Sequence, residues 1–150
     1  MKILAIVPFG SRLYNTSTVF HDVDIVLIVD GHRRSQVIKD TLDVHIVPVT
    51  HLLDIKNSKN VMESEVALAI EYGHAIVFDT PWKPMILSIK AGVPAYGDTI
   101  RRYMSKNSVP AKHRVRYDIF LKRFWETGNA DPKLSDEERQ EWLELYTAAS

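Results

Sequence analysis

Short apolar runs separated by polar breaks fill the first half of the chain, a pattern typical of β-strands. Three runs predict buried strands, at 3–7, 24–29 and 42–49. The stretch HAIVFD at 74–79 is a possible fourth strand, and HRRSQVIKDTL at 32–42 fits either a short helix or an extended segment. Because proline cannot donate a ladder hydrogen bond, Pro48 places the third strand at an edge or near its own end.

Helical spacing dominates the second half. Helices are predicted at 62–73, 81–92, 98–106, 111–128 and 131–146. Glycines close the first two, and Ser135 with Glu138 forms a capping box for the last. We expect four large aromatic residues in the core, namely Phe120, Phe124, Trp125 and Trp142. Three basic residues, Lys112, Arg114 and Arg116, are expected to be solvated, with contact to an acceptor nucleic acid as the alternative.

Strands first and helices afterwards predict an α+β domain, a small mixed sheet followed by a helical C-terminal half. The 150 residues suit one domain, with a sheet core at 1–90 and a helical part at 91–150. No apolar run is long enough for a membrane helix, and the apolar N-terminus is not followed by a cleavage site. The absence of cysteine excludes disulfides and thiolate metal sites, and we expect a cytoplasmic protein.

Charge is unevenly distributed although the formal net charge is zero. Residues 1–80 carry a net −3, residues 81–130 a net +7 and residues 131–150 a net −4. The basic middle indicates either a field for an anionic ligand or a solvated helix face.

Two aspartates, Asp22 and Asp24, stand at the start of the second strand. Because alternate residues of a strand share a face, we expect both carboxylates on one face, with Val23 and Ile25 turned into the core. Neighbouring carboxylates repel each other and are costly to bury, so a hard divalent cation is expected between them. The Gly10-Ser11 pair ends the preceding strand, where glycine allows close backbone approach and the hydroxyl and N–H groups can hold a phosphate.

This arrangement resembles the nucleotidyltransferase superfamily that includes DNA polymerase β. Gly10-Ser11, ten further residues and then Asp22-Val23-Asp24 match its signature. The run GSRLYNTST at 10–18 is similar to the Gly-Ser-x-x-Tyr-Gly-Thr-x-Thr version of small stand-alone phage and bacterial members. Asn15 replaces a glycine of that version, and asparagine tolerates left-handed backbone. His21 stands where a small residue is common.

The resemblance implies a Mg²⁺-dependent nucleotidyltransferase that moves a nucleoside monophosphate from a nucleoside triphosphate to an acceptor hydroxyl and releases pyrophosphate. Two Mg²⁺ ions would be held by Asp22, Asp24 and Asp43, of which Asp43 begins the following strand and acts on the hydroxyl. The nucleotide would be bound by residues of the Gly-Ser run, namely Gly10, Ser11, Arg12 and Thr16. The acceptor stays open among RNA, DNA, protein and small molecules.

Two other functions fit the same residues. The fold can serve as a non-catalytic protein that binds nucleic acid or a partner. A glycosyltransferase can also use the Asp22-x-Asp24 pair to bind a nucleotide sugar. A nicotinamide-binding domain is disfavoured, because Gly10 lacks the other glycines of that fingerprint.

Overall fold

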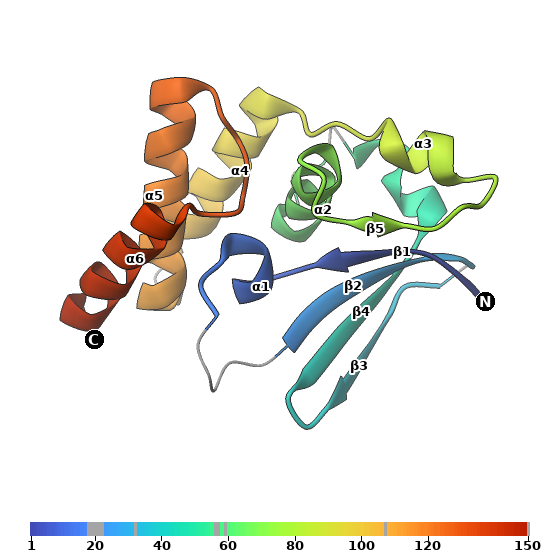
Figure 1. Cartoon of the computed structure of the whole chain (residues 1–150), viewed down its shortest axis with the longest axis horizontal. Helices are drawn as coiled ribbons and strands as arrows, with labels where there is room; N and C mark the ends of the chain where they lie inside the picture. Colours follow the sequence, from blue (N-terminus) through green and yellow to red (C-terminus); the bar gives the residue numbers. More distant parts are fainter. Residues whose placement is uncertain (18–22, 32, 56–57, 59, 107, 150) are drawn as a thin grey trace.

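A mixed five-stranded sheet forms one layer of the molecule (Figure 1). The structure is a computed structural model that describes the chain except residues 18–22, 32, 56–57, 59, 107 and 150, and except the side chains of 93–98 and 148–149. The strands are β1 (Lys2–Pro8), β2 (Val23–Asp30), β3 (Ser35–Lys39), β4 (Leu42–Pro48) and β5 (Ile76–Val77). Their order is β3-β4-β2-β1-β5, in which β2 and β4 are parallel and the other neighbours antiparallel.

The predicted strands are confirmed, and the ambiguous segment 32–42 contributes a strand, β3. It pairs with β4 through a turn at Asp40, whose φ is 54°. Pro48 is the last residue of β4, which lies inside the sheet between β3 and β2. The proline therefore marks the end of a strand and not the edge of the sheet.

Most of the remaining chain is helical. The helices are α1 (Ser11–Tyr14), a short 3₁₀ helix (Val49–Leu52), α2 (Val61–Glu71), α3 (Lys83–Leu87), α4 (Val93–Met104), α5 (Ala111–Thr127) and α6 (Asp136–Ala149). The predicted helix at 81–92 is wrong in extent, because α3 ends at Leu87 and Gly92 is the N-cap of α4. Pro94, which fits the first turn of a helix but not its interior, starts a new helix there.

Helices α2 to α6 lie on one side of the sheet (Figure 1). Asp24 shares that covered face with Val26 and Ile28, whose side chains are fully buried. Val23 and Ile25, predicted to point into the core, lie on the opposite face and are only half-buried. The prediction was wrong because residues 23–29 of β2 are apolar on both faces apart from Asp24, so alternation does not reveal the covered side.

The predicted core and solvated residues of α5 and α6 need two corrections. The buried aromatic residues include Phe120, Phe124 and Trp142, as predicted. Trp125, however, is 54% exposed, and the Arg101 guanidinium lies 4.8 Å from its ring centroid. Arg116, predicted to be solvated, is buried. The apolar stripe of α5 is therefore narrower than its aromatic content implies.

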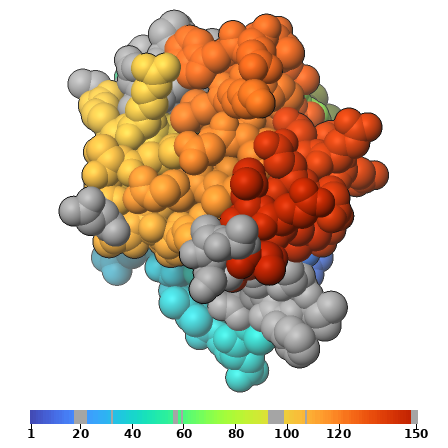
Figure 2. Space-filling view, turned by 90° about the vertical axis from the view of Figure 1, so that its left-hand side faces the viewer, coloured from blue at the N-terminus to red at the C-terminus, as the bar shows by residue number. Residues whose placement is uncertain are grey.

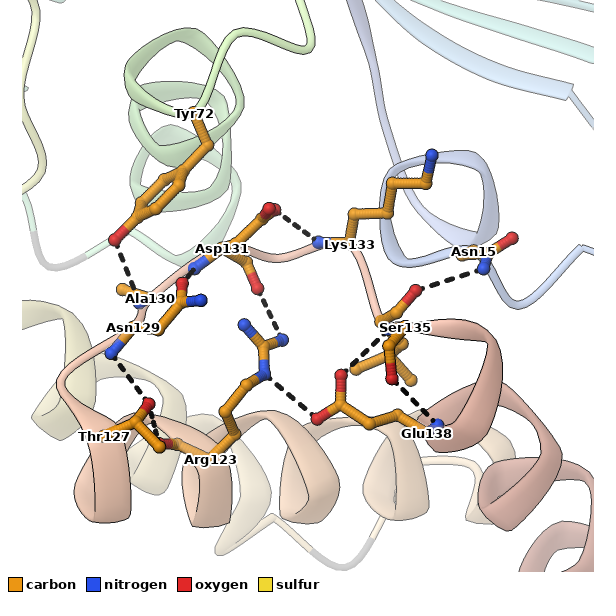
Figure 3. Close-up of polar contacts among 11 residues, drawn as sticks. Asn15, Tyr72, Arg123, Thr127, Asn129, Ala130, Asp131, Lys133, Ser135 and Glu138 are labelled. Carbon is orange, nitrogen blue, oxygen red and sulfur yellow. Dashed lines mark hydrogen bonds and ion pairs between the residues drawn. The ribbon is translucent and has the colours of Figure 1, made fainter.

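The loop between α5 and α6 is held by side chains from both sides (Figure 3). Arg123 donates to the Asp131 carbonyl at 2.6 Å and forms an ion pair with Glu138 at 3.0 Å. The Asp131 carboxylate lies 2.6 Å from His74 Nε2, which ties the loop to the end of α2. Ser135 and Glu138 form the predicted capping box, each accepting from the backbone N–H of the other.

The same loop holds the turn that follows Gly10-Ser11. The Leu134 N–H donates to the Tyr14 carbonyl at 3.2 Å, and the Asn15 side chain donates back to the Leu134 carbonyl at 3.1 Å (Figure 3). Arg139 of α6 adds a bond to the Ser17 carbonyl at 3.0 Å. Asn15 is left-handed, with φ 60° and ψ 37°. Asparagine thus adopts the left-handed conformation at this position and supplies a donor that a glycine would lack.

Replacing Asn15 separates these two contributions. Asn15→Gly keeps the left-handed backbone and loses one hydrogen bond, so the free energy of unfolding should fall by about 1 kcal/mol. Asn15→Ala also places a Cβ in left-handed backbone, so the loss should be about 2 kcal/mol. Urea unfolding measures both variants, and equal losses would contradict this account.

Candidate functional site

A cavity of about 360 Å³ lies between the covered face of the sheet and the helices. From the sheet and the turn after β1 it is lined by Gly10, Ser11, Thr16, Asp24, Asp43 and His45. From the helices it is lined by Glu65, Tyr103, Lys112, Arg116, Tyr117 and Trp142, among others. Both halves of the chain are therefore needed to form the cavity.

Most of the predicted site residues meet in this cavity. The five that line it are Gly10, Ser11, Thr16, Asp24 and Asp43. Arg12 is exposed and is not among the lining residues, so the structure does not place it beside the others. Asp22, predicted as a metal ligand, and His21 lie outside the residues that the structure describes.

Asp24 and Asp43 are direct neighbours across the sheet. They are register partners on the parallel strands β2 and β4, which places their side chains on the same face, one strand spacing of about 4.8 Å apart. Asp43 Oδ1 accepts a hydrogen bond from Gln36 Nε2 at 2.8 Å, and Asp43 Oδ2 lies 3.7 Å from His45 Nε2. The His45 ring packs edge-on against Phe9. Gln36 and His45 thus hold the Asp43 carboxylate in position.

Gly10 brings the end of β1 against the carboxylate of Asp24. Its φ of 59° and ψ of −136° belong to a region that glycine adopts readily and other residues do not. A Cβ at this position would lie 2.7 Å from Asp24 Oδ2, a distance that real Cβ atoms do not tolerate. The sequence predicts that this glycine admits an anion close to the backbone, and in the structure the anion that it admits is the Asp24 carboxylate.

The turn after Gly10 is internally bonded. The N–H groups of Leu13 and Tyr14 both donate to the Gly10 carbonyl, and the Thr16 N–H donates to the Ser11 carbonyl at 2.9 Å. The Ser17 hydroxyl lies 3.4 Å from the Ser11 hydroxyl, and the Thr16 side chain is buried. The hydroxyls that face the cavity are therefore held by a fixed backbone.

A buried polar cluster that sequence analysis missed forms part of the helical wall. Tyr117 donates to Glu65 Oε1 at 2.7 Å, and Arg116 Nη2 donates to the Tyr117 hydroxyl at 3.3 Å. The Arg116 guanidinium stacks on the Tyr14 ring, 4.3 Å from its centroid. The Nε atom of Arg116 has no hydrogen-bond partner within the described part of the chain. Tyr14 thereby joins the Gly10-Ser11 turn to α2 and α5.

Burial sets the ionisation of this cluster. Desolvation raises the pKa of Glu65 above its ordinary value of 4.5, although the Arg116 charge and hydrogen bonds from Tyr117 and Tyr14 act in the opposite direction. Desolvation, together with the nearby Glu65 charge, also raises the pKa of Tyr117 well above 10.0. The sequence held one signal for this cluster, since Glu65 is an acid within the apolar run of α2.

The two walls of the cavity carry different charged groups. The sheet wall carries the carboxylates of Asp24 and Asp43, whereas the helical wall carries the cations Lys112 and Arg116 together with Glu65, which interacts electrostatically with Arg116. Trp142 Nε1 donates to the Lys112 carbonyl at 2.9 Å, which connects this part of α5 to α6. Such an arrangement suits a ligand that combines a metal ion with phosphate groups.

Asp24 and Asp43 are the carboxylates whose placement fits a metal ion, because both face the cavity and are oxygen donors of the type that Mg²⁺ prefers. Among the described residues, no group of three or more histidine, aspartate or glutamate side chains is placed to hold an ion. Asp22, the third carboxylate of the predicted set, is not one of those residues.

Comparison with known proteins gives no relative: no family model matches the chain, and neither a curated protein nor a solved structure matches it significantly. Within the described part of the chain, every helix is too short or too polar to cross a membrane. The site must therefore be interpreted from its own geometry.

A double-mutant cycle tests the contact between Gly10 and Asp24. Gly10→Ala should lower the free energy of unfolding by about 1–3 kcal/mol through strain alone, with the clash in addition. Asp24→Ala removes the clash. The free energy of unfolding of the double variant should therefore be about 1 kcal/mol higher than the sum of the two single-variant effects predicts. Gly128→Ala is the matched control, since Gly128 has a φ of 76° and a Cβ added there would meet no atom within 4 Å. Additive behaviour at Gly10 as well would rule out the contact.

The Glu65 cluster predicts a particular pH dependence. A carboxyl whose folded pKa is raised contributes its full stability below 4.5 and loses it as pH rises through the folded pKa. Glu65→Gln removes this loss but leaves Arg116 without its counter-charge at every pH. The stability of the variant relative to the wild type should therefore increase between pH 4 and pH 7. Urea unfolding across this range checks the slope, and a flat or falling difference would show that the pKa of Glu65 is not raised.

Proposed function

We propose that the cavity transfers a nucleoside monophosphate from a nucleoside triphosphate to an acceptor hydroxyl, with release of pyrophosphate. One observation carries this proposal. Asp24 and Asp43 stand side by side on parallel strands, and Gly10 and Ser11 open into the same cavity with Gly10 packed on the Asp24 carboxylate. Paired carboxylates next to a glycine-serine turn are the groups that nucleotidyl transfer requires.

The sheet supports the same proposal. β1 runs antiparallel to β2, so the Gly-Ser end of β1 meets the start of β2, where Asp24 lies. β4 runs parallel to β2 and the two strands start at the same end of the sheet, so Asp43 lies beside Asp24. These are the relative positions that the nucleotidyltransferase signature requires, and we assign the sheet to that topology as part of the proposal.

Asp24 and Asp43, with Asp22 as the third member of the set, would hold the magnesium. When bound, magnesium supplies positive charge that neutralises the triphosphate and polarises the α-phosphate. The chain's own groups do the remaining work. Ser11 and the Gly10 backbone hold the outer phosphates, and Lys112 and Arg116 add positive charge from the opposite wall.

Asp43 acts on the acceptor. Gln36 and His45 fix its carboxylate at the cavity wall, where it orients the acceptor hydroxyl and receives its proton. The acceptor oxygen forms a bond to the α-phosphorus while the bond from the α-phosphorus to the bridging oxygen breaks. The electron pair of that bond leaves with pyrophosphate.

Isosteric loss of either carboxylate should abolish the reaction. With a labelled nucleoside triphosphate and Mg²⁺, Asp24→Asn and Asp43→Asn should each reduce transfer by about 10²-fold or more, because each removes a charge that the transition state requires. Titration with Mn²⁺, followed by its electron paramagnetic resonance signal, should show weaker binding in Asp24→Asn than in the wild type.

Asp30→Asn is the matched control, since Asp30 is an exposed acid at the other end of β2. It should transfer and bind Mn²⁺ like the wild type. Undiminished transfer in both Asp24→Asn and Asp43→Asn would refute the proposal. A wild-type protein that binds nucleotides without transferring them would indicate a binding protein, and turnover restricted to nucleotide sugars would indicate a glycosyltransferase.

A further inference from the structure

A second hollow, of about 380 Å³, adjoins the cavity. It lies between the start of α2 and the second half of α4, and it shares Val61, Met62 and Tyr103 with the cavity. Its other lining residues are Asn60, Thr99, Arg102 and Lys106. Because the two spaces share these residues, a ligand that occupies the hollow lies next to the proposed reaction site.

The charge of the hollow is positive. Of the described residues that line it, Arg102 and Lys106 are the charged ones, and both are cations. The surrounding segment 98–118 contains six lysines and arginines and two acids, one at each end. Glu63, an acid in the first turn of α2, forms an ion pair with Arg34 at 2.8 Å. An anionic ligand is therefore favoured here.

The geometry favours a chain of phosphates over a single anion. Cations line both spaces: Lys112 lines the cavity, and Lys106 and Arg102 line the adjoining hollow. Tyr103 stands between them, and its ring lies 5.8 Å from Lys106 Nζ. An aromatic ring flanked by cations is the combination that binds a base and its neighbouring phosphates in single-stranded nucleic acids.

The corner that carries these cations is built into the fold. Arg114 donates to the Met104 carbonyl at 2.6 Å and to the Lys106 carbonyl at 3.0 Å, which fixes the connection between α4 and α5. Figure 2 shows α4 and α5 side by side on one face of the molecule. Arg114 thus holds the backbone of the segment that carries Lys106.

We infer that the acceptor is the end of a single-stranded nucleic acid, which occupies this hollow and presents its terminal hydroxyl to the cavity. The inference rests on the proposed function, because it names the acceptor of that reaction. Lys106 and Arg102 bind the backbone phosphates behind the terminal nucleotide, and Tyr103, which lines both spaces, stacks on a base.

The test is binding of a fluorescein-labelled single-stranded ten-nucleotide RNA or DNA, measured by anisotropy without any nucleoside triphosphate. In the double variant Arg102→Gln/Lys106→Gln, Kd should rise about tenfold, and the slope of log affinity against log salt should fall by about 1.4, or 0.7 for each phosphate that the variant no longer neutralises. Lys122→Gln/Lys133→Gln is the matched control, since it removes two exposed lysines outside the hollow. It should bind like the wild type.

A transfer assay distinguishes this inference from the proposed function. The double variant should raise KM for the oligonucleotide and leave KM for the nucleoside triphosphate unchanged. If the wild type transfers but both double variants bind the oligonucleotide equally, the acceptor assignment is wrong and the proposed function stands. If a ten-residue polyglutamate binds as tightly and loses affinity equally in the Arg102→Gln/Lys106→Gln variant, the surface attracts any polyanion and the nucleic-acid assignment fails. If Asp24→Asn transfers normally, the proposed function fails, and the anisotropy result still decides whether the hollow binds nucleic acid.

Discussion

Burial of two opposite charges between the halves of the molecule is the constraint on which the site depends. Glu65 and Arg116 are both withdrawn from water, and each is costly to bury unless its polar atoms find partners. Tyr117 and Tyr14 supply most of those partners, and Tyr14 comes from the turn that carries Ser11. The helices can therefore cover the sheet in few orientations, because sliding them would leave a charge without a partner.

An apolar cluster of the same volume would often stabilise such an interface as well or better, since buried charges gain little net free energy from each other. The polar cluster nevertheless stands beside the cavity, and Glu65, Arg116 and Tyr117 line it. Arg116, a member of this cluster, lines the same cavity as Asp24 and Asp43. Only glycine fits at position 10, beside the Asp24 carboxylate. This contact and the buried cluster fix the positions of the charged groups before any ligand binds.

Much of this fold follows from the sequence, and the limits have physical causes. Helices and strands were predictable where apolar spacing was regular, and the capping box of α6 followed from two residues. The covered face of the sheet was not predictable, because β2 is apolar at every position from 23 to 29 except Asp24. Gly10, Ser11, Asp24 and Asp43, which line one cavity, were singled out in the sequence because they resemble the nucleotidyltransferase signature. Glu65 was missed, although it is an acid within the apolar run of α2. Arg116 was wrongly expected to be solvated, because a basic residue in a helix has the same sequence appearance whether it is buried or solvated.

The division of the cavity between sheet and helices has a consequence for the strength of electrostatic interactions inside it. Asp24 and Asp43 are only part-exposed, and without the helical wall they would face bulk water, where charge interactions are about fourfold weaker than at a protein surface of effective dielectric constant about 20. The helices therefore influence the strength of interactions made by carboxylates that they do not themselves provide. A protein that kept the sheet motif but lost the helices would retain Asp24 and Asp43. It would lose the surroundings of lower dielectric constant in which their charges interact more strongly.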